Sequence, residues 1–306
     1  MIELRDVCKS FGQVRAVDKI SFATREGEIF GLLGPNGAGK STTIKMIMNI
    51  LAPDSGSILF NGDSIRKSDM DRIGYLPEER GLYRKVKINE MLLYFASLKN
   101  ADRAASEKRL DEWFARFDLT EWKTRTPEAL SKGMAQKVQF ISAILHDPEF
   151  LFLDEPFSGL DPVSTDVLRE AVLELGSQGK TILFSTHNME VAEKICSRIL
   201  IVDHGREVIS GSLADIKSRY GHNVVVAEFD GTIDFSSLSG MVRDVTRFPR
   251  WVEIELAEGA SPQTLLSILV SQVSVRRFEV VSPSLHKIFV EIVGKGAKTD
   301  SERMSE

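Results

Sequence analysis

Residues 29–51 contain the pattern that most limits what this chain can fold into. An apolar run, IFGLL at 29–33, leads directly into the glycine-rich segment GPNGAGKST at 34–42. After that segment, Ile44, Ile47, Met48 and Leu51 recur at the spacing of one face of a helix. The pattern therefore predicts a strand, a tight glycine-rich loop and a helix in immediate succession.

The loop matches GxxxxGK(S/T), a pattern that binds phosphate groups when it lies between a strand and a helix. Its glycines let backbone N–H groups turn inward around phosphates, and the helix N-terminus adds the positive end of its dipole. Lys40 is expected to reach the β- and γ-phosphates, and the Ser41 hydroxyl to bind Mg²⁺. The candidate nucleotide-binding residues are Gly34, Pro35, Asn36, Gly37, Ala38, Gly39, Lys40, Ser41 and Thr42. A glycine-rich turn without a ligand is the alternative, and the agreement of pattern and context disfavours it.

Two adjacent carboxylates follow a second apolar run, FLFL at 150–153. We expect Asp154 to hold the metal, directly or through water, and Glu155 to polarise the attacking water as a general base. An apolar run before two acids is weak by itself, and a solvated strand end is the alternative. The phosphate loop favours the functional interpretation, and together the two elements predict a P-loop NTPase. No NKxD sequence occurs, which argues against a GTPase.

A third segment, LSKGMAQK at 130–137, resembles the LSGGQ signature of ATP-binding cassette (ABC) proteins. The elements that resemble this family stand in family order over about residues 1–220. By this resemblance, Phe11 stacks on adenine and His187 approaches the γ-phosphate. A buried core role for Phe11 and an ordinary polar role for His187 are the alternatives. The resemblance also identifies a D-loop, formed by Ser158, Gly159, Leu160 and Asp161. It implies a signature that covers the nucleotide of a second chain, formed by Leu130, Ser131, Lys132, Gly133 and Met134.

The sequence departs from the family pattern in two places. Lys132 and Met134 stand where the signature has Gly and Gln, and Glu78 stands where the Q-loop usually has Gln. By its place in that loop Glu78 is a candidate metal contact, and a solvated loop carboxylate is the alternative. The run GYLPEERGLY at 74–83 resembles one branch of the family, ATPases paired with sodium, drug or related type-two exporters.

The predicted fold class is α/β, with a P-loop NTPase core, an N-terminal antiparallel β layer and a helical subdomain at about 80–145. These parts form an ATPase domain over 1–220. Segments 87–117 and 133–146 are predicted to be helical. A change of pattern near residue 220 predicts a small C-terminal α+β domain over 222–293, whose last helix begins at Ser282-Pro283. The polar tail, 294–306, is expected to be disordered.

The family resemblance implies an ATPase that uses ATP and Mg²⁺ and works as a homodimer or with a related chain. It also implies a separately encoded membrane permease and a place on the cytoplasmic face of the cell membrane. No apolar run approaches the roughly 18 residues of a membrane helix, and the charged N-terminus does not resemble a signal peptide. Cys8 and Cys196 are expected to be free thiols in a reducing compartment.

Four other classes of protein are less well supported. The net charge of −5 argues against a protein that coats nucleic acid. A DNA-repair or chromosome-structuring ATPase would carry long coiled coils between the phosphate loop and the signature, and no sustained heptad occurs there. A translation-linked ATPase would carry two cassettes in one chain. A purely regulatory nucleotide binder would lack Lys40 or Glu155, and both are present.

Overall fold

The computed structural model describes residues 1–79, 81–219, 224–257, 259–281 and 283–293. Its contacts divide the chain into two compact units, Met1–Ser212 and Leu213–Glu306. The sequence prediction placed this division near residue 220. Helix α7 (Leu213–Arg219) belongs to the second unit by its contacts, so the division falls before that helix.

The first unit is built on two sheets. An antiparallel sheet has the order β2-β1-β4-β5, with strands β1 (Ile2–Phe11), β2 (Val14–Ala23), β4 (Ser55–Phe60) and β5 (Asp63–Ser64). A mixed sheet has the order β10-β9-β3-β8-β7-β6, with strands β3 (Ile29–Leu33), β6 (Ile73–Leu76), β7 (Phe150–Asp154), β8 (Thr181–Thr186), β9 (Arg198–Asp203) and β10 (Arg206–Ser212). Only β10 runs antiparallel to its neighbour in this second sheet. Strands β3, β7 and β8 are buried at every position, as expected for parallel strands covered on both faces.

Helix α1 (Lys40–Ile47) lies between the two sheets. Ile44 and Ile47 on this helix share one core with Leu4 of the antiparallel sheet and Phe152 of the mixed sheet. Two more helices follow β7 and β8, namely α5 (Pro162–Ser177) and α6 (Met189–Ile195). This core fixes α1 and the phosphate loop before it against the mixed sheet.

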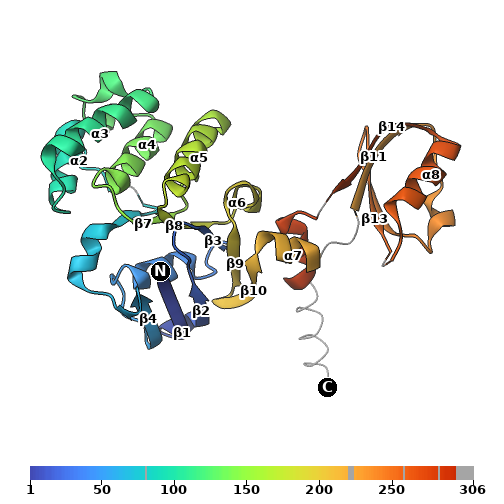
Figure 1. Ribbon diagram of the computed structural model, residues 1–306, viewed down its shortest axis with the longest axis horizontal. Helices are drawn as coiled ribbons and strands as arrows, with labels where there is room; N and C mark the ends of the chain where they lie inside the picture. The colour runs from blue at the N-terminus through green and yellow to red at the C-terminus, as the bar shows by residue number, and fades with distance from the viewer. Residues whose placement is uncertain (80, 220–223, 258, 282, 294–306) are drawn as a thin grey trace. The chain divides into compact units, whose positions relative to one another are not determined.

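Three helices between β6 and β7 form the predicted helical subdomain: α2 (Ile88–Ser97), α3 (Arg103–Arg116) and α4 (Lys132–Ile144). Figure 1 shows them gathered at one end of the first unit, with β1, β2 and β4 at the other. The segment 87–117, predicted as helical, is broken into two helices. Asn100 adopts a left-handed φ of 54°, and the Asp102 side chain caps α3 by accepting from the Ala105 N–H at 2.8 Å.

The second unit contains an antiparallel sheet of order β12-β13-β11-β14, and this confirms its predicted α+β character. Its elements are β11 (Val224–Asp230), β12 (Val242–Arg247), β13 (Val252–Leu256), α8 (Pro262–Gln272) and β14 (Ser274–Val281), and residues 285–293 form a further helix. Leu265 and Leu269 of α8 pack in one core with Val225 and Ile254 of the sheet. Ser284 accepts the capping bond of the last helix, from the Lys287 N–H at 3.2 Å. The predicted cap residue Ser282 and the tail 294–306 lie outside the described residues.

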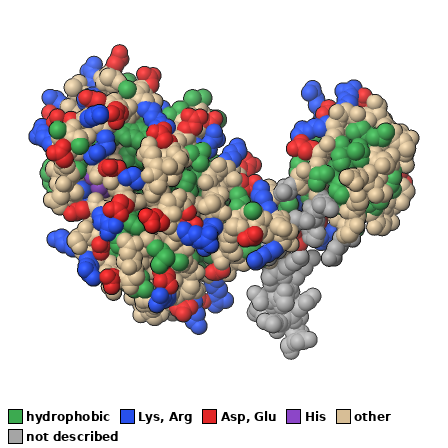
Figure 2. Space-filling model, in the orientation of Figure 1, with side chains coloured by type: hydrophobic (Ala, Val, Ile, Leu, Met, Phe, Trp, Pro, Cys, Tyr) green, Lys and Arg blue, Asp and Glu red, His purple; other side chains and the backbone are tan. Residues whose placement is uncertain are grey.

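The surface of the first unit has no single-sign charge on the face in view. Figure 2 shows basic and acidic side chains interspersed over this unit. In the described part of the chain, no helix combines the length and the apolar character that a membrane span requires.

Candidate functional site

Four strands of the mixed sheet end at the edge where the predicted site residues lie. Gly34 follows β3, Glu155 follows β7, His187 follows β8 and Glu78 lies two residues beyond β6. Ligands of open parallel sheets bind at this carboxyl edge. A cavity of about 320 Å³ lies here and is lined by Ala16, Asn36, Gly37, Gly39, Lys40, Ser41, Thr42, Glu78 and Glu155.

Two glycines of the loop are required by close backbone approaches. Gly39 has a φ of 101°, and a Cβ there would lie 2.3 Å from the Ala16 carbonyl oxygen of β2. Gly34 has a φ of 150°, and a Cβ there would lie 2.1 Å from the Val202 carbonyl oxygen of β9. Only glycine fits such positions, so the loop is held tightly between the two sheets. Ala16 was not expected at the cavity, because the sequence does not show where β2 approaches the loop.

Lys40 lies at the centre of this cavity wall. Its Nζ donates to the carbonyl oxygens of Gly34 and Pro35 at 2.9 and 3.1 Å, and lies 3.3 Å from Oε1 of Glu155. The Lys40 and Glu155 side chains are almost fully buried, which strengthens their electrostatic interaction. The ammonium group therefore donates to protein oxygens in this structure. Phosphate oxygens are acceptors of the same kind and would bind the same group.

Asp154 accepts hydrogen bonds at Oδ1 from two hydroxyl groups, Ser41 Oγ at 3.0 Å and Ser185 Oγ at 2.5 Å. Ser185 also positions Glu155. The Glu155 N–H donates to the Oγ and to the carbonyl oxygen of Ser185, both at 3.2 Å. Glu155 has a φ of 49°, a left-handed conformation that is strained for a residue with a side chain. Sequence reasoning missed Ser185, although pairing the ends of the two predicted strands would have placed it opposite Asp154.

His187 contacts Glu155, with 3.0 Å between its Nδ1 and Oε1 of the carboxylate. The imidazole is about half exposed, whereas the carboxylate is buried. Tyr75 of β6 feels the charge of two carboxylates of the site. Burial, with the negative charges of Asp154 and Glu78, raises the pKa of Tyr75 to about 12, so its hydroxyl stays neutral.

The donor atoms at the cavity suit Mg²⁺. The Ser41 hydroxyl and the Glu78 carboxylate line the cavity, and the Asp154 carboxylate accepts from Ser41 beside it. All three are hard oxygen donors, the kind that Mg²⁺ prefers. Over the described residues, no group of three or more His, Cys, Asp or Glu side chains forms a metal cage. In proteins, Mg²⁺ is commonly bound by one or two carboxylates, and phosphate oxygens and water complete its coordination.

The signature lies outside this cavity, at the start of α4. Ser131 is its N-cap and accepts from the Met134 N–H at 3.3 Å. The Lys132 side chain lies directly against Gly159, where an added Cβ would be 2.1 Å from its Nζ. Gly133 faces Asp161, the N-cap of α5. Within one chain, the structure thus brings the signature to the D-loop and leaves both away from the cavity.

Phe11 ends β1 and is also absent from the cavity lining. Its side chain is 49% exposed, and Nζ of Lys9 lies 5.8 Å from the ring centroid. The alternative of a buried core residue is therefore wrong. Stacking on adenine stays a prediction.

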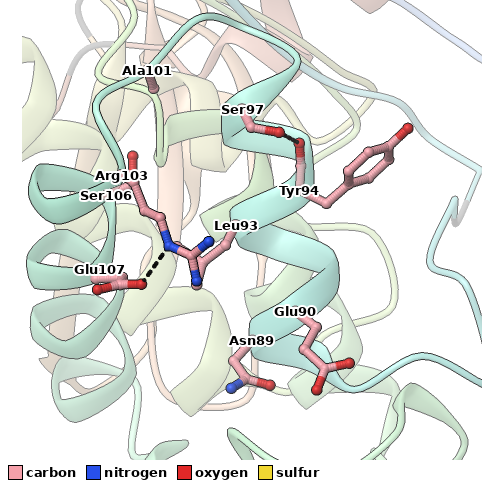
Figure 3. Close-up of a pocket in the computed structure, with 9 residues that line it drawn as sticks. All are labelled: Asn89, Glu90, Leu93, Tyr94, Ser97, Ala101, Arg103, Ser106 and Glu107. Atoms are coloured by element: carbon pink, nitrogen blue, oxygen red, sulfur yellow. Dashed lines mark hydrogen bonds and ion pairs between the residues drawn. The ribbon is translucent and has the colours of Figure 1, made fainter.

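A second cleft of about 480 Å³ lies between α2 and α3 in the helical subdomain (Figure 3). Asn89 lines it, and its Oδ1 is buried without a partner among the described residues. Arg103 and Glu107 form an ion pair at its wall, with 3.0 Å between Nε and Oε1, and Tyr94 extends from α2 beside the cleft. The cleft thus presents polar and apolar groups together.

Comparison with known proteins decides the class. Residues 17–158 match the family model described as ABC transporter, and residues 211–293 match the model of a DrrA1-3-like ATP-binding protein C-terminal domain. The chain is 42% identical to an uncharacterized ABC transporter ATP-binding protein, YhaQ of Bacillus subtilis, over 96% of this chain and 99% of that protein. The chain belongs to the ABC transporter ATP-binding proteins. It is accordingly an ATPase subunit, and the predicted family and fold class are confirmed.

Two further relatives extend the comparison. The linearmycin resistance ATP-binding protein LnrL of Bacillus subtilis is 32% identical, over 96% of this chain and 99% of that protein. A solved structure described as the ATP binding subunit of an ABC transporter has a TM-score of 0.67 at 33% identity. The matched region covers 72% of this chain and 93% of the chain in that solved structure. The similarity to LnrL thus includes the C-terminal domain, whereas the solved structure covers a smaller share of this chain.

Proposed function

We propose that this ABC ATPase powers export, as a dimer joined to a separately encoded permease on the cytoplasmic face of the cell membrane. The observation that supports ATP hydrolysis is the group of Lys40, Ser41 and Glu155 at one cavity of the mixed sheet, with Asp154 hydrogen-bonded to Ser41. Export is supported by similarity to a linearmycin resistance protein along nearly the whole chain, including its C-terminal domain.

In this proposal each side chain at the cavity has one task. Mg²⁺, when bound, supplies positive charge that offsets the charge of the phosphates. Lys40 would exchange its contact with Glu155 for the β- and γ-phosphates, and Ser41 and Asp154 would hold the ion. Glu155 then accepts a proton from the attacking water, with His187 at 3.0 Å orienting its carboxylate and reaching the γ-phosphate. Backbone N–H groups of the loop and of the α1 N-terminus bind the remaining phosphate oxygens.

The position of the signature supports a head-to-tail dimer. Ser131 and Gly133 lie outside the cavity of their own chain and beside the D-loop. This position supports the proposal that they cover a nucleotide held by another chain. ATP would join two chains across this surface, and hydrolysis would separate them.

The proposed metal role of Glu78 has a direct test. Glu78→Gln keeps the size of the side chain but removes a charge from the cavity, so the Mg²⁺ concentration for half-maximal ATPase activity should change while ATP affinity is kept. Glu79→Gln is the matched control, because Glu79 is the neighbouring carboxylate and does not line the cavity. Superimposable Mg²⁺ titrations of Glu78→Gln and the unaltered protein would contradict this role and favour a solvated loop carboxylate.

The proposed export through a separate permease has its own test. Co-purification with the permease of a neighbouring gene, followed by extrusion assays in vesicles, tests the proposal. Export that depends on ATP supports it, and a permease that imports under the same conditions contradicts it.

A further inference from the structure

The helix that begins at the signature extends one row of side chains toward both acidic segments of the site. Lys132, Gln136 and Gln139 are spaced i, i+4 and i+7 on α4, which places them on one face. Lys132 lies against Gly159, and Gln136 Nε2 donates to the Pro156 carbonyl oxygen at 3.0 Å. The first two side chains of the row therefore hold the segment that follows Glu155.

The third side chain holds a different segment. Gln139 Nε2 donates to the carbonyl oxygens of Pro77 and Glu79, at 3.2 and 3.1 Å. These two carbonyl groups flank Glu78, which lines the nucleotide cavity. The Gln139 amide therefore bridges the backbone on both sides of that carboxylate.

The two hydrogen bonds from Nε2 orient the Gln139 amide, although this orientation leaves its oxygen without a donor. The residue is 3% exposed, and its Oε1 is buried without a partner in the part of the chain that the structure describes. A buried acceptor without a donor is unfavourable, so the two bonds from Nε2 must determine the orientation. A residue needed only for packing would not require an amide here.

We propose that Gln139 is a positioning residue, which holds Glu78 at the cavity and links it to the signature helix. The proposal rests on the proposed metal role of Glu78. Because Ser131 caps the same helix, a shift of α4 on contact with the partner chain's nucleotide is carried to the carbonyl groups beside Glu78. One nucleotide site can thereby bias the metal contact of the other, which is a coupling between two sites through a shared rigid element.

Gln139→Met tests the link, because methionine has a similar length and no donor. The Pro77 and Glu79 carbonyl oxygens lose their shared donor in this variant, so the segment should open more easily. Without nucleotide or metal, amide hydrogen exchange at Glu78 and Glu79 should therefore become roughly tenfold faster, the scale of one or two lost hydrogen bonds. Gln136→Met is the matched control. It removes an amide from the same helix and should speed exchange near Pro156 while leaving Glu78 and Glu79 unchanged. Unchanged exchange at Glu78 and Glu79 in Gln139→Met would overturn the proposal.

A double-mutant cycle then asks whether Gln139 acts through Glu78. Gln139→Met should shift the Mg²⁺ dependence of ATPase activity in the same direction as Glu78→Gln, and the double variant should shift no further. Two shifts that add independently would overturn the proposal, as would a shift in Glu78→Gln alone. If Glu78→Gln itself causes no shift, the metal role of Glu78 fails. The exchange measurement still decides separately whether Gln139 holds the loop.

Discussion

Lys40 and Glu155 form a buried ion pair, with 3.3 Å between Nζ and Oε1. A phosphate that enters the loop competes with this carboxylate for the ammonium group. The pair therefore joins the residue expected to hold the γ-phosphate to the residue expected to activate water.

Lys40→Met should abolish ATP binding and also destabilise the fold. It leaves the buried Glu155 carboxylate without its cation, and breaking such a pair typically costs about 3 kcal/mol or more. Urea denaturation and binding of a fluorescent ATP analogue measure the two effects. Adding Glu155→Gln should restore much of the stability without restoring binding, and a double variant as unstable as Lys40→Met would argue against this explanation.

Stability should fall in mild acid because of His146. This residue is largely buried, its Nε2 lies 3.1 Å from the Ile73 carbonyl oxygen, and burial lowers its pKa from 6.5 to about 4. Between these two values the unfolded chain binds a proton that the folded chain excludes, so the free energy of unfolding decreases as pH falls from 6.5 to 4.

His146→Gln keeps a donor for the carbonyl group and cannot titrate. The variant should lose up to about 3 kcal/mol of this pH dependence, with little change above pH 7. Chemical denaturation at several pH values measures it. Parallel stability profiles of the two proteins would show that His146 is protonated in the fold.

A chain that ends near residue 220 should still bind ATP. The cavity lining and His187 all come from the first unit, so the C-terminal domain supplies no described group to it. Circular dichroism should first establish that the shortened protein is folded, and titration with an ATP analogue then measures affinity. A folded but non-binding protein would show that the C-terminal domain contributes to the site.

The parts of the site that sequence could predict are those in which one short segment carries both the structure and the chemistry. The loop at 34–42 lies between β3 and α1, as its pattern indicated, and Asp154 and Glu155 stand at the end of β7. Asp161-Pro162 begins α5 because Asp161 caps it and proline suits its first turn. Each of these features depends on neighbours within a few residues.

The features that sequence did not reveal depend on distant parts of the chain. Gln139 resembles any polar residue of a helix until the fold brings it to Pro77 and Glu79. Strand β12 carries no clear sequence signal, because Val242 is its only fully buried side chain and no apolar alternation marks it. The helix break at Asn100 was missed because the residues on both sides favour a helix, and a single left-handed residue turns the chain.

The most direct test of the account is the ATP-dependent oligomeric state of Glu155→Gln. The variant keeps the size of the side chain and weakens its hold on Lys40, so ATP binding should survive while hydrolysis falls roughly 10²-fold or more. Size-exclusion chromatography with light scattering should show a monomer without nucleotide and a dimer with Mg-ATP. Near-normal turnover, or a monomer that binds Mg-ATP without associating, would contradict the proposed cycle of closure and hydrolysis.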